Sequence, residues 1–302
     1  MFKCVLYGIL VECNYDFFKD LHLLSQDSAC FDNIEHHMRI KIDVYDNNPF
    51  SHYGVGKINE NEYYFHTCDC CYQIGKGYIY VFCKNINIFL ETFLNIPFSI
   101  YFLINDLGVL LHCSAVYNKN FVLAFSGKKG IGKSTILEGF LKHNIGNYYF
   151  YSDDTLRVVL DKNNECYSSL PFVKITGNAD DFSSKKYYYS SSNKFFVPLY
   201  EYDLLDGTMC KKQIKKIFYL TQRATSLEHK LIVDSNMKFI LMANNISGFS
   251  SFTESLKELA ISKLGLYCDS ISVELVSLTD NKLSLEGDLT KLIGDDRVER
   301  FV

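Results

Sequence analysis

A glycine-rich segment is the part of this sequence whose residue types and spacing point most directly to a chemistry. Residues 127–135 read Gly-Lys-Lys-Gly-Ile-Gly-Lys-Ser-Thr and fit the pattern G-x-x-x-x-G-K-[ST], which surrounds nucleotide phosphates. Glycines let backbone N–H groups close around phosphate oxygens without a clashing Cβ, and a helix that begins there adds its positive dipole end. The segment therefore predicts a binding site for a nucleoside triphosphate.

Each residue of this segment has an expected role. Lys133 is predicted to reach the β- and γ-phosphates, and Ser134 to hold Mg²⁺. The other residues expected to contact the nucleotide are Gly127, Lys128, Lys129, Gly130, Ile131, Gly132 and Thr135. ATP and Mg²⁺ are thus the expected cofactors. The alternative interpretation is a glycine turn that merely joins a strand to a helix.

The flanking residues favour the phosphate-binding interpretation. Residues 121–125 form a short apolar run typical of a buried strand, and residues 136–141 have apolar positions spaced for one face of a helix. Strand, glycine loop and helix follow one another in the order that a phosphate loop requires.

Two neighbouring acids, Asp153 and Asp154, follow an aromatic run at residues 148–151 that we expect to be a strand. Ligands of α/β sheets lie beyond the carboxyl ends of strands, so both carboxylates are expected to face the nucleotide. One acid can hold Mg²⁺, and the other could accept the proton of an attacking hydroxyl. The alternative is an Asp pair that caps a turn. A second pair, at 180–181, has no strand before it and is interpreted as solvated.

Composition narrows the class of protein. The chain has 302 residues, 48% of them hydrophobic and 22% charged, as expected for a well-cored globular protein. A net charge of −4 gives no electrostatic footprint for nucleic acid, and the lysine-rich stretches at 185–189 and 211–216 are interpreted as solvated. Eleven cysteines lack the spacing of a disulfide framework, which favours a reducing cytoplasm. The cluster at 66–71 lacks a second Cys/His pair at zinc spacing, so its thiols are expected to bind no metal.

No segment is predicted to cross a membrane. Residues 1–11 have a short apolar stretch without a cleavage site and are interpreted as the first strand rather than a signal peptide. Residues 89–111 are the most apolar segment, but polar residues and a proline interrupt it before the length that a span needs. We expect a buried helix there.

The order of patterns predicts an α/β fold with mixed sheets, divided into a β-rich N-terminal region at 1–88 and a phosphate-loop domain at 89–302. The strands expected in the first region are 4–7, 39–43, 62–66 and 78–82, mostly antiparallel. After the acidic pair we expect strands at 155–160, 214–220 and 271–276, a helix at 253–266 and a polar loop at 180–193. Long loops in compact domains are often functional lids.

Three of these segments together resemble the HPr kinase/phosphorylase-like family, whose pattern runs L-H-x-S, G-x-S-G-x-G-K-S and D-D. The matching stretches are Leu-His-Cys-Ser at 111–114, the glycine segment, and Ser-Asp-Asp at 152–154. The resemblance covers about residues 100–225, including 171–174, Lys194 and the strand at 214–220. The sequence departs from the family pattern at Lys128 and Lys129, where the family usually has a small or acidic residue followed by Ser. This departure leaves the nucleotide preference open.

The resemblance implies a kinase core related to phosphoenolpyruvate carboxykinase. It implies Asp153 as general base, Asp154 as the magnesium-side acid, with the opposite order open, and His112 as a partner of the acids. Lys174 and Lys194 would neutralise phosphate oxygens. The N-terminal region is similar to the short β-rich leader of HPr-kinase-like proteins from peptide-modification gene clusters. Members of that branch, including tailoring kinases of lasso-type peptides, phosphorylate a serine on a ribosomally made precursor peptide.

The first functional hypothesis is therefore a kinase that transfers the γ-phosphoryl group of ATP to a serine of a peptide or small protein. A second keeps the enzyme but takes a small metabolite as acceptor. A third is a nucleotide-responsive regulatory protein with weak hydrolysis, although no glutamine directly follows the acidic pair, and Gln222 and Arg223 receive no role. The oligomeric state is open, with a homo-oligomer as one option. The kinase hypothesis requires Lys133, Asp153 and Asp154 to converge.

Overall fold

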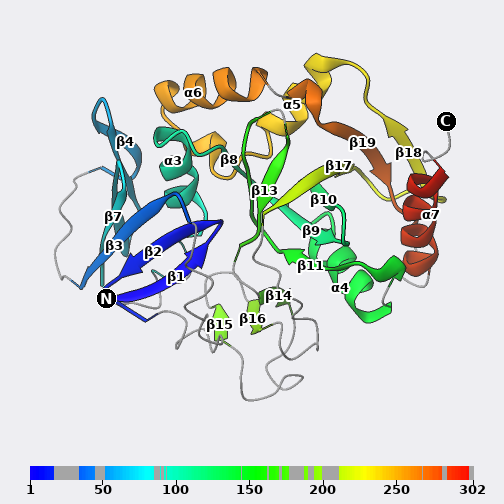
Figure 1. Cartoon of the computed structure of the whole chain (residues 1–302), viewed down its shortest axis with the longest axis horizontal. Coiled ribbons are helices and arrows are strands. Elements are labelled where there is room, and N and C mark those ends of the chain that lie inside the picture. The colour runs from blue at the N-terminus through cyan, green and yellow to red at the C-terminus, as the bar shows by residue number, and fades with distance from the viewer. Residues whose placement is uncertain are drawn as a thin grey trace.

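Two large mixed β-sheets and five α-helices make up the described part of the chain (Figure 1). The computed structural model describes residues 1–16, 34–44, 52–84, 89, 92, 94–143, 145–161, 163–169, 172–176, 187–189, 194–198, 211–266, 268–280 and 284–298. For 172–176, 187–189, 194–198 and 295–298 only the backbone is described.

The N-terminal sheet has seven strands in the spatial order β1-β2-β3-β7-β6-β5-β4. Its strands are β1 Phe2–Leu6, β2 Ile9–Cys13, β3 His37–Val44, β4 Gly54–Asn59, β5 Glu62–His66, β6 Cys70–Gly75 and β7 Tyr78–Cys83. The pairs β2–β3 and β3–β7 are parallel and the other pairs are antiparallel. In β3 the buried residues Met38, Ile40 and Ile42 alternate with more exposed ones, so one face of the sheet packs against the core.

The apolar segment at 89–111 is not one helix as expected. Helix α3 spans Ile96–Ile104 and is followed by strand β8, Val109–Leu111. The helix ends at Asn105, and Asp106 and Gly108 have φ of 60° and 108°, which a continuous helix cannot accommodate. A Cβ on Gly108 would stand 2.1 Å from the carbonyl oxygen of Val158, so glycine is required where the chain turns into β8.

The central sheet has nine strands, seven of them in the order β11-β9-β10-β17-β13-β12-β8, with β19 beside β17 and β18 beside β19. Besides β8 its members are β9 Cys113–Tyr117, β10 Val122–Gly127, β11 Tyr149–Ser152, β12 Leu156–Val158, β13 Glu165–Tyr167, β17 Lys212–Leu220, β18 Glu228–Leu231 and β19 Ser272–Ser277. The neighbours β10, β17 and β19 are parallel, so their carboxyl ends meet at one edge. The strands expected at 121–125, 148–151, 155–160, 214–220 and 271–276 all belong to this sheet.

Helices pack against the central sheet in two hydrophobic clusters. α4 Lys133–His143 and α7 Leu285–Val298 pack with Phe125, Phe218 and Val276 in one cluster. The other cluster combines α3, α5 Ser235–Ala243 and α6 Glu254–Gly265 with residues of both large sheets. Thr253 caps α6 by accepting a hydrogen bond from the N–H of Leu256 (3.4 Å). This helix confirms the one predicted at 253–266. The division at residue 88 stays a prediction, but the N-terminal sheet shares its core with the rest of the chain.

A third, small sheet contains part of the segment that we expected to be a loop. It has β14 Phe172–Thr176, β16 Lys194–Pro198 and β15 Tyr187–Tyr189, in the order β14-β16-β15. The expectation of a loop at 180–193 is thus wrong for β15, and residues 180–186 and 190–193 lie outside the described residues. None of the described helices combines the length and apolar character that crossing a bilayer requires.

Candidate phosphate-binding and acidic site

The glycine segment joins a strand to a helix at the edge where the parallel strands end. β10 ends at Gly127 and α4 begins at Lys133. Gly127, Gly130 and Gly132 have φ of 140°, 83° and 106°, which residues with a Cβ rarely adopt. A Cβ on Gly127 would also stand 2.7 Å from the carbonyl oxygen of Leu220. Phosphate loops require glycines of this kind, and ordinary glycine turns use them as well. The phosphate-binding interpretation therefore stays a prediction that this backbone fits.

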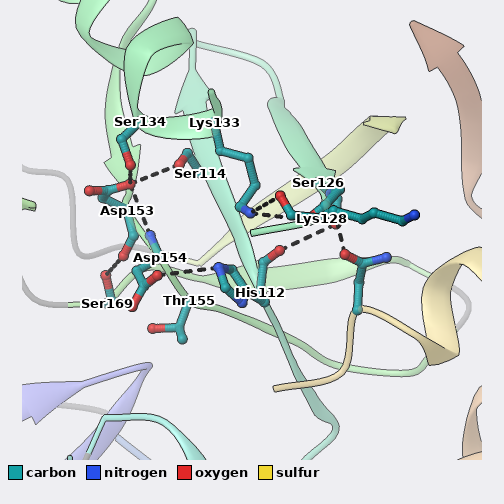
Figure 2. Close-up of polar contacts among 12 residues, drawn as sticks. His112, Ser114, Ser126, Lys128, Lys133, Ser134, Asp153, Asp154, Thr155 and Ser169 are labelled. Carbon is teal, nitrogen blue, oxygen red and sulfur yellow. Dashed lines mark hydrogen bonds and ion pairs between the residues drawn. The ribbon is translucent and has the colours of Figure 1, made fainter. Parts of the chain in front are cut away.

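Lys133 points back into this loop (Figure 2). Its Nζ donates to the carbonyl oxygens of Gly127 (3.0 Å) and Lys128 (3.3 Å), and only 7% of the residue is exposed. The ammonium group is therefore held against the loop in which phosphates would lie. Lys128, Lys129, Gly130 and Thr135 are exposed, whereas Ile131, Gly132 and Ser134 are half-buried.

Asp153 lies where the loop helix meets the sheet. Its Oδ1 accepts hydrogen bonds from Ser134 Oγ (3.2 Å), Ser114 Oγ (2.8 Å) and the backbone N–H of Asp154 (3.0 Å). The carboxylate is 2% exposed and stands between the first turn of α4 and strand β9 (Figure 2). The structure thus brings the serine of the glycine segment and the first acid together, although they lie on different elements.

Asp154 has a different partner. His112 Nε2 lies 3.4 Å from Asp154 Oδ1, and the side chains are 38% and 20% exposed (Figure 2). Asp154 has a φ of 70°, a left-handed conformation that is uncommon outside glycine and that often marks functional sites. Ser152 Oγ donates to the carbonyl oxygen of Thr155 and contacts Ser169 Oγ at 2.8 Å, and these bonds close the turn around the two acids.

The contacts separate the two acids in a way that the sequence left open. Asp153 is buried and contacts the glycine-segment serine, whereas Asp154 is more exposed and contacts His112. A serine hydroxyl and a buried carboxylate are the hard oxygen ligands that Mg²⁺ prefers. This geometry favours Asp153, rather than Asp154, as the magnesium-side acid, so it favours the reverse of the expected order.

Two further side chains hold the site together. Asn245 Oδ1 accepts the N–H of Gly127 (3.3 Å), and its carbonyl oxygen accepts the N–H of His112 (2.7 Å). Ser126 Oγ donates to the carbonyl oxygen of His112 (3.3 Å). Ser114 was within reach of sequence reasoning as the serine of the L-H-x-S stretch. Asn245 had no sequence signal, because it lies far along the chain from both residues that it contacts.

The structure describes only the backbone of the two remaining predicted residues, Lys174 and Lys194. Lys174 lies on β14 and Lys194 begins β16, where it pairs with Thr176, but their side chains lie outside the described part of the structure. Their predicted contact with phosphate therefore stays a prediction. In the cluster at 66–71, Cys70 and Cys71 are buried and Cys68 is exposed. The described residues include no group of three or more His, Cys, Asp and Glu side chains arranged to hold a metal ion.

The chain resembles solved structures but matches nothing at the sequence level. The sequence matches no protein-family model and no curated protein. Among solved structures, the chain is similar to the Hpr(Ser) kinase/phosphatase from Coxiella burnetii, with a TM-score of 0.36 and 10% sequence identity. The alignment covers 63% of this chain and 98% of the other. This is a weak structural resemblance, and it assigns no role to any residue of this chain.

Proposed function

We propose that this protein is a magnesium-dependent kinase that transfers the γ-phosphoryl group of ATP to a hydroxyl group. The observation that carries the proposal is the hydrogen bond between Ser134, on the helix that follows the glycine loop, and Asp153, on the acidic turn. It supports a single site in which Lys133 and the N-terminus of α4 face the phosphates. Asp154 lies beside it on the same turn and contacts His112, which lies between β8 and β9.

Each residue then has a role in phosphoryl transfer. Lys133 and the loop N–H groups bind and orient the triphosphate, and Ser134 and Asp153 would hold Mg²⁺. Magnesium, when bound, neutralises negative charge on the phosphoryl oxygens. Asp154 accepts the proton of the attacking hydroxyl, and His112 orients the carboxylate of Asp154. Lys174 and Lys194, on neighbouring strands of the small sheet, are proposed to add positive charge near the transferred group.

The proposed acceptor is a serine of a peptide or small protein, as the family resemblance of the sequence implies. Free cysteines that are mostly buried fit the reducing cytoplasm as the place of action. A small metabolite is the alternative acceptor, and a regulatory protein with slow hydrolysis is the alternative class. These three possibilities differ in where the γ-phosphate of ATP ends up: on a peptide, on a metabolite or as free phosphate.

The test uses the full chain with Mg²⁺ and γ-labelled ATP, offered in parallel to serine-containing peptides and to small hydroxyl metabolites. We expect a mass gain of one phosphate on a peptide. Lys133→Ala should weaken ATP binding and transfer together. Asp154→Asn should lower transfer by about a hundredfold or more, the scale of a general base, while ATP binding stays within about twofold of wild type.

Asp153→Asn should instead shift the Mg²⁺ dependence of ATP binding, because that carboxylate is proposed to face the metal. Asp269→Asn is the matched control, since this exposed aspartate precedes β19, at the opposite edge of the sheet from the phosphate loop. Wild-type protein that does not bind Mg²⁺-ATP would refute the proposal. Label found only as free phosphate would favour the regulatory protein.

A further inference from the structure

Arg223 lies beside the phosphate loop on the side opposite the acids. Strand β17 runs parallel to β10, with Leu220 opposite Gly127, so both strands end at the same edge of the central sheet. Arg223 follows three residues after Leu220. Its segment is fixed to the end of β19 and to the residue that follows it by two backbone hydrogen bonds. They run from Thr221 to Val276 (2.9 Å) and from Ala224 to Leu278 (3.0 Å).

The guanidinium group of Arg223 is directed at the loop. Its Nη2 would stand 2.9 Å from a Cβ added to Gly132, so the side chain lies against the last glycine before Lys133. Nη1 donates to the carbonyl oxygen of Thr279 (3.3 Å), and Thr279 is held by Asp288 of α7 through its N–H (2.8 Å) and its hydroxyl (3.1 Å). Arg223 makes no ion pair with any carboxylate among the described residues. Its remaining donors can therefore serve a ligand.

The order of strands fixes which end of a nucleotide would lie near Arg223. In the order β11-β9-β10-β17, the acidic turn follows β11 and Arg223 follows β17, with the phosphate loop after β10 between them. The γ-phosphate must approach the acids if Asp154 is to act on the attacking hydroxyl. The α-phosphate and nucleoside then extend toward β17.

We propose that Arg223 binds the α-phosphate end of the nucleotide and is a second cation of the site beside Lys133. This inference rests on the proposed function. A guanidinium is always charged and presents several donors in a plane, which suits paired hydrogen bonds to phosphate oxygens. The bond to Thr279 orients this plane before the ligand arrives. Lys133 then serves the β- and γ-phosphates, and Arg223 anchors the part of the nucleotide that does not react.

Equilibrium binding of Mg²⁺-ATP and Mg²⁺-ADP to the full chain tests the assignment. Arg223→Ala and Arg223→Gln should raise the Kd of both nucleotides by a similar factor, about ten- to a hundredfold for loss of charge-assisted hydrogen bonds. Gln keeps much of the length and can still donate to Thr279, so its loss of affinity reports the charge. Arg39→Ala, at an exposed arginine of β3, is the control and should leave both Kd values unchanged.

The outcomes separate this inference from the proposed function. If wild type binds neither nucleotide, both fail. If wild type binds but both Arg223 variants bind equally well, with unchanged melting temperatures, only the role of Arg223 is refuted. Weakened binding of ATP with unchanged binding of ADP would also refute it, because it would put Arg223 at the γ-phosphate.

Discussion

Asp153 is the residue on which the candidate site depends most. Its buried carboxylate accepts hydrogen bonds from two serine hydroxyls and one backbone N–H, all on the same oxygen, Oδ1. A buried charge is tolerated only where such donors compensate for lost hydration. The hydrogen bond from Ser114 is the shortest of the three, and Ser114 lies on β9, outside the glycine segment. It therefore fixes Asp153 independently of whether nucleotide is bound.

Replacing Ser114 tests this interpretation. We expect Ser114→Ala to lower the free energy of unfolding by about 1–3 kcal/mol, because it removes a donor from a buried acceptor. Urea denaturation at neutral pH measures the change. Ser99→Ala is a matched control, because Ser99 is also buried but its Oγ has no hydrogen-bond partner in the described structure. That variant should unfold at the wild-type urea concentration or slightly above, and equal losses in both variants would contradict the role of Ser114.

At the scale of elements, the first hairpin of the chain contacts the acidic turn and stabilises it. The turn between β1 and β2 places Tyr7 OH 2.6 Å from Thr155 Oγ1, directly after the two acids. Burial raises the pKa of the Tyr7 hydroxyl well above its usual value, so the group stays neutral. The N-terminal sheet thus contacts the site itself, and the acidic turn is not held by the central sheet alone.

Arg157 of β12 completes this support. Its Nη1 donates to the carbonyl oxygen of Tyr7 (2.7 Å), and its Nε donates to that of Leu107 (2.8 Å). The guanidinium also lies over the ring of Tyr167, 4.7 Å from its centroid. Burial lowers the pKa of Arg157 to about 10, so the group remains charged at neutral pH. One arginine thereby joins the first hairpin, the segment after α3 and strand β12.

Removal of this arginine should therefore cost more than removal of an exposed one. Arg157→Leu leaves two buried carbonyl oxygens without their donor, at about 1–3 kcal/mol each, so we expect a loss of about 3 kcal/mol or more in unfolding free energy. Arg39→Leu, at an exposed residue of β3, should change it by less than about 0.5 kcal/mol. Chemical denaturation of both variants measures the difference. Similar midpoints for the two would refute the structural role of Arg157.

The sequence predicted the elements with strong local patterns and missed those that depend on distant contacts. β10, α4, β11, β17, α6 and β19 were expected because apolar spacing and glycine positions specify them locally. Helix α5 was missed, although Asp234 caps it by accepting the N–H of Met237 (2.6 Å) and a capping residue can be recognised in a sequence. The role of Asn245 could not be found in this way, because it arises only when the segment after α5 pairs with the end of β8.

On the scale of the whole molecule, the two large sheets form one hydrophobic core. A single cluster contains Val11, Ile40 and Val81 of the N-terminal sheet together with Phe102 of α3 and Ile217 of β17. Helix α3 contacts strands β5 and β6 of the N-terminal sheet and strand β8 of the central sheet. Burial of apolar surface is the dominant stabilising contribution to folding, so neither sheet is expected to be stable without the other.

This shared core predicts one cooperative unfolding transition, and fluorescence can test it because the chain has no tryptophan. Tyr80→Trp places a probe on β7 of the N-terminal sheet, and Tyr149→Trp places one on β11 at the far edge of the central sheet. In urea, both probes should report the same midpoint and the same slope, since a shared core exposes its surface in one step. A fragment of residues 89–302 should lack a cooperative transition, because it exposes the apolar surface of α3. Separate midpoints for the two probes, or a cooperatively folded fragment, would show that the division at residue 88 is a true domain boundary.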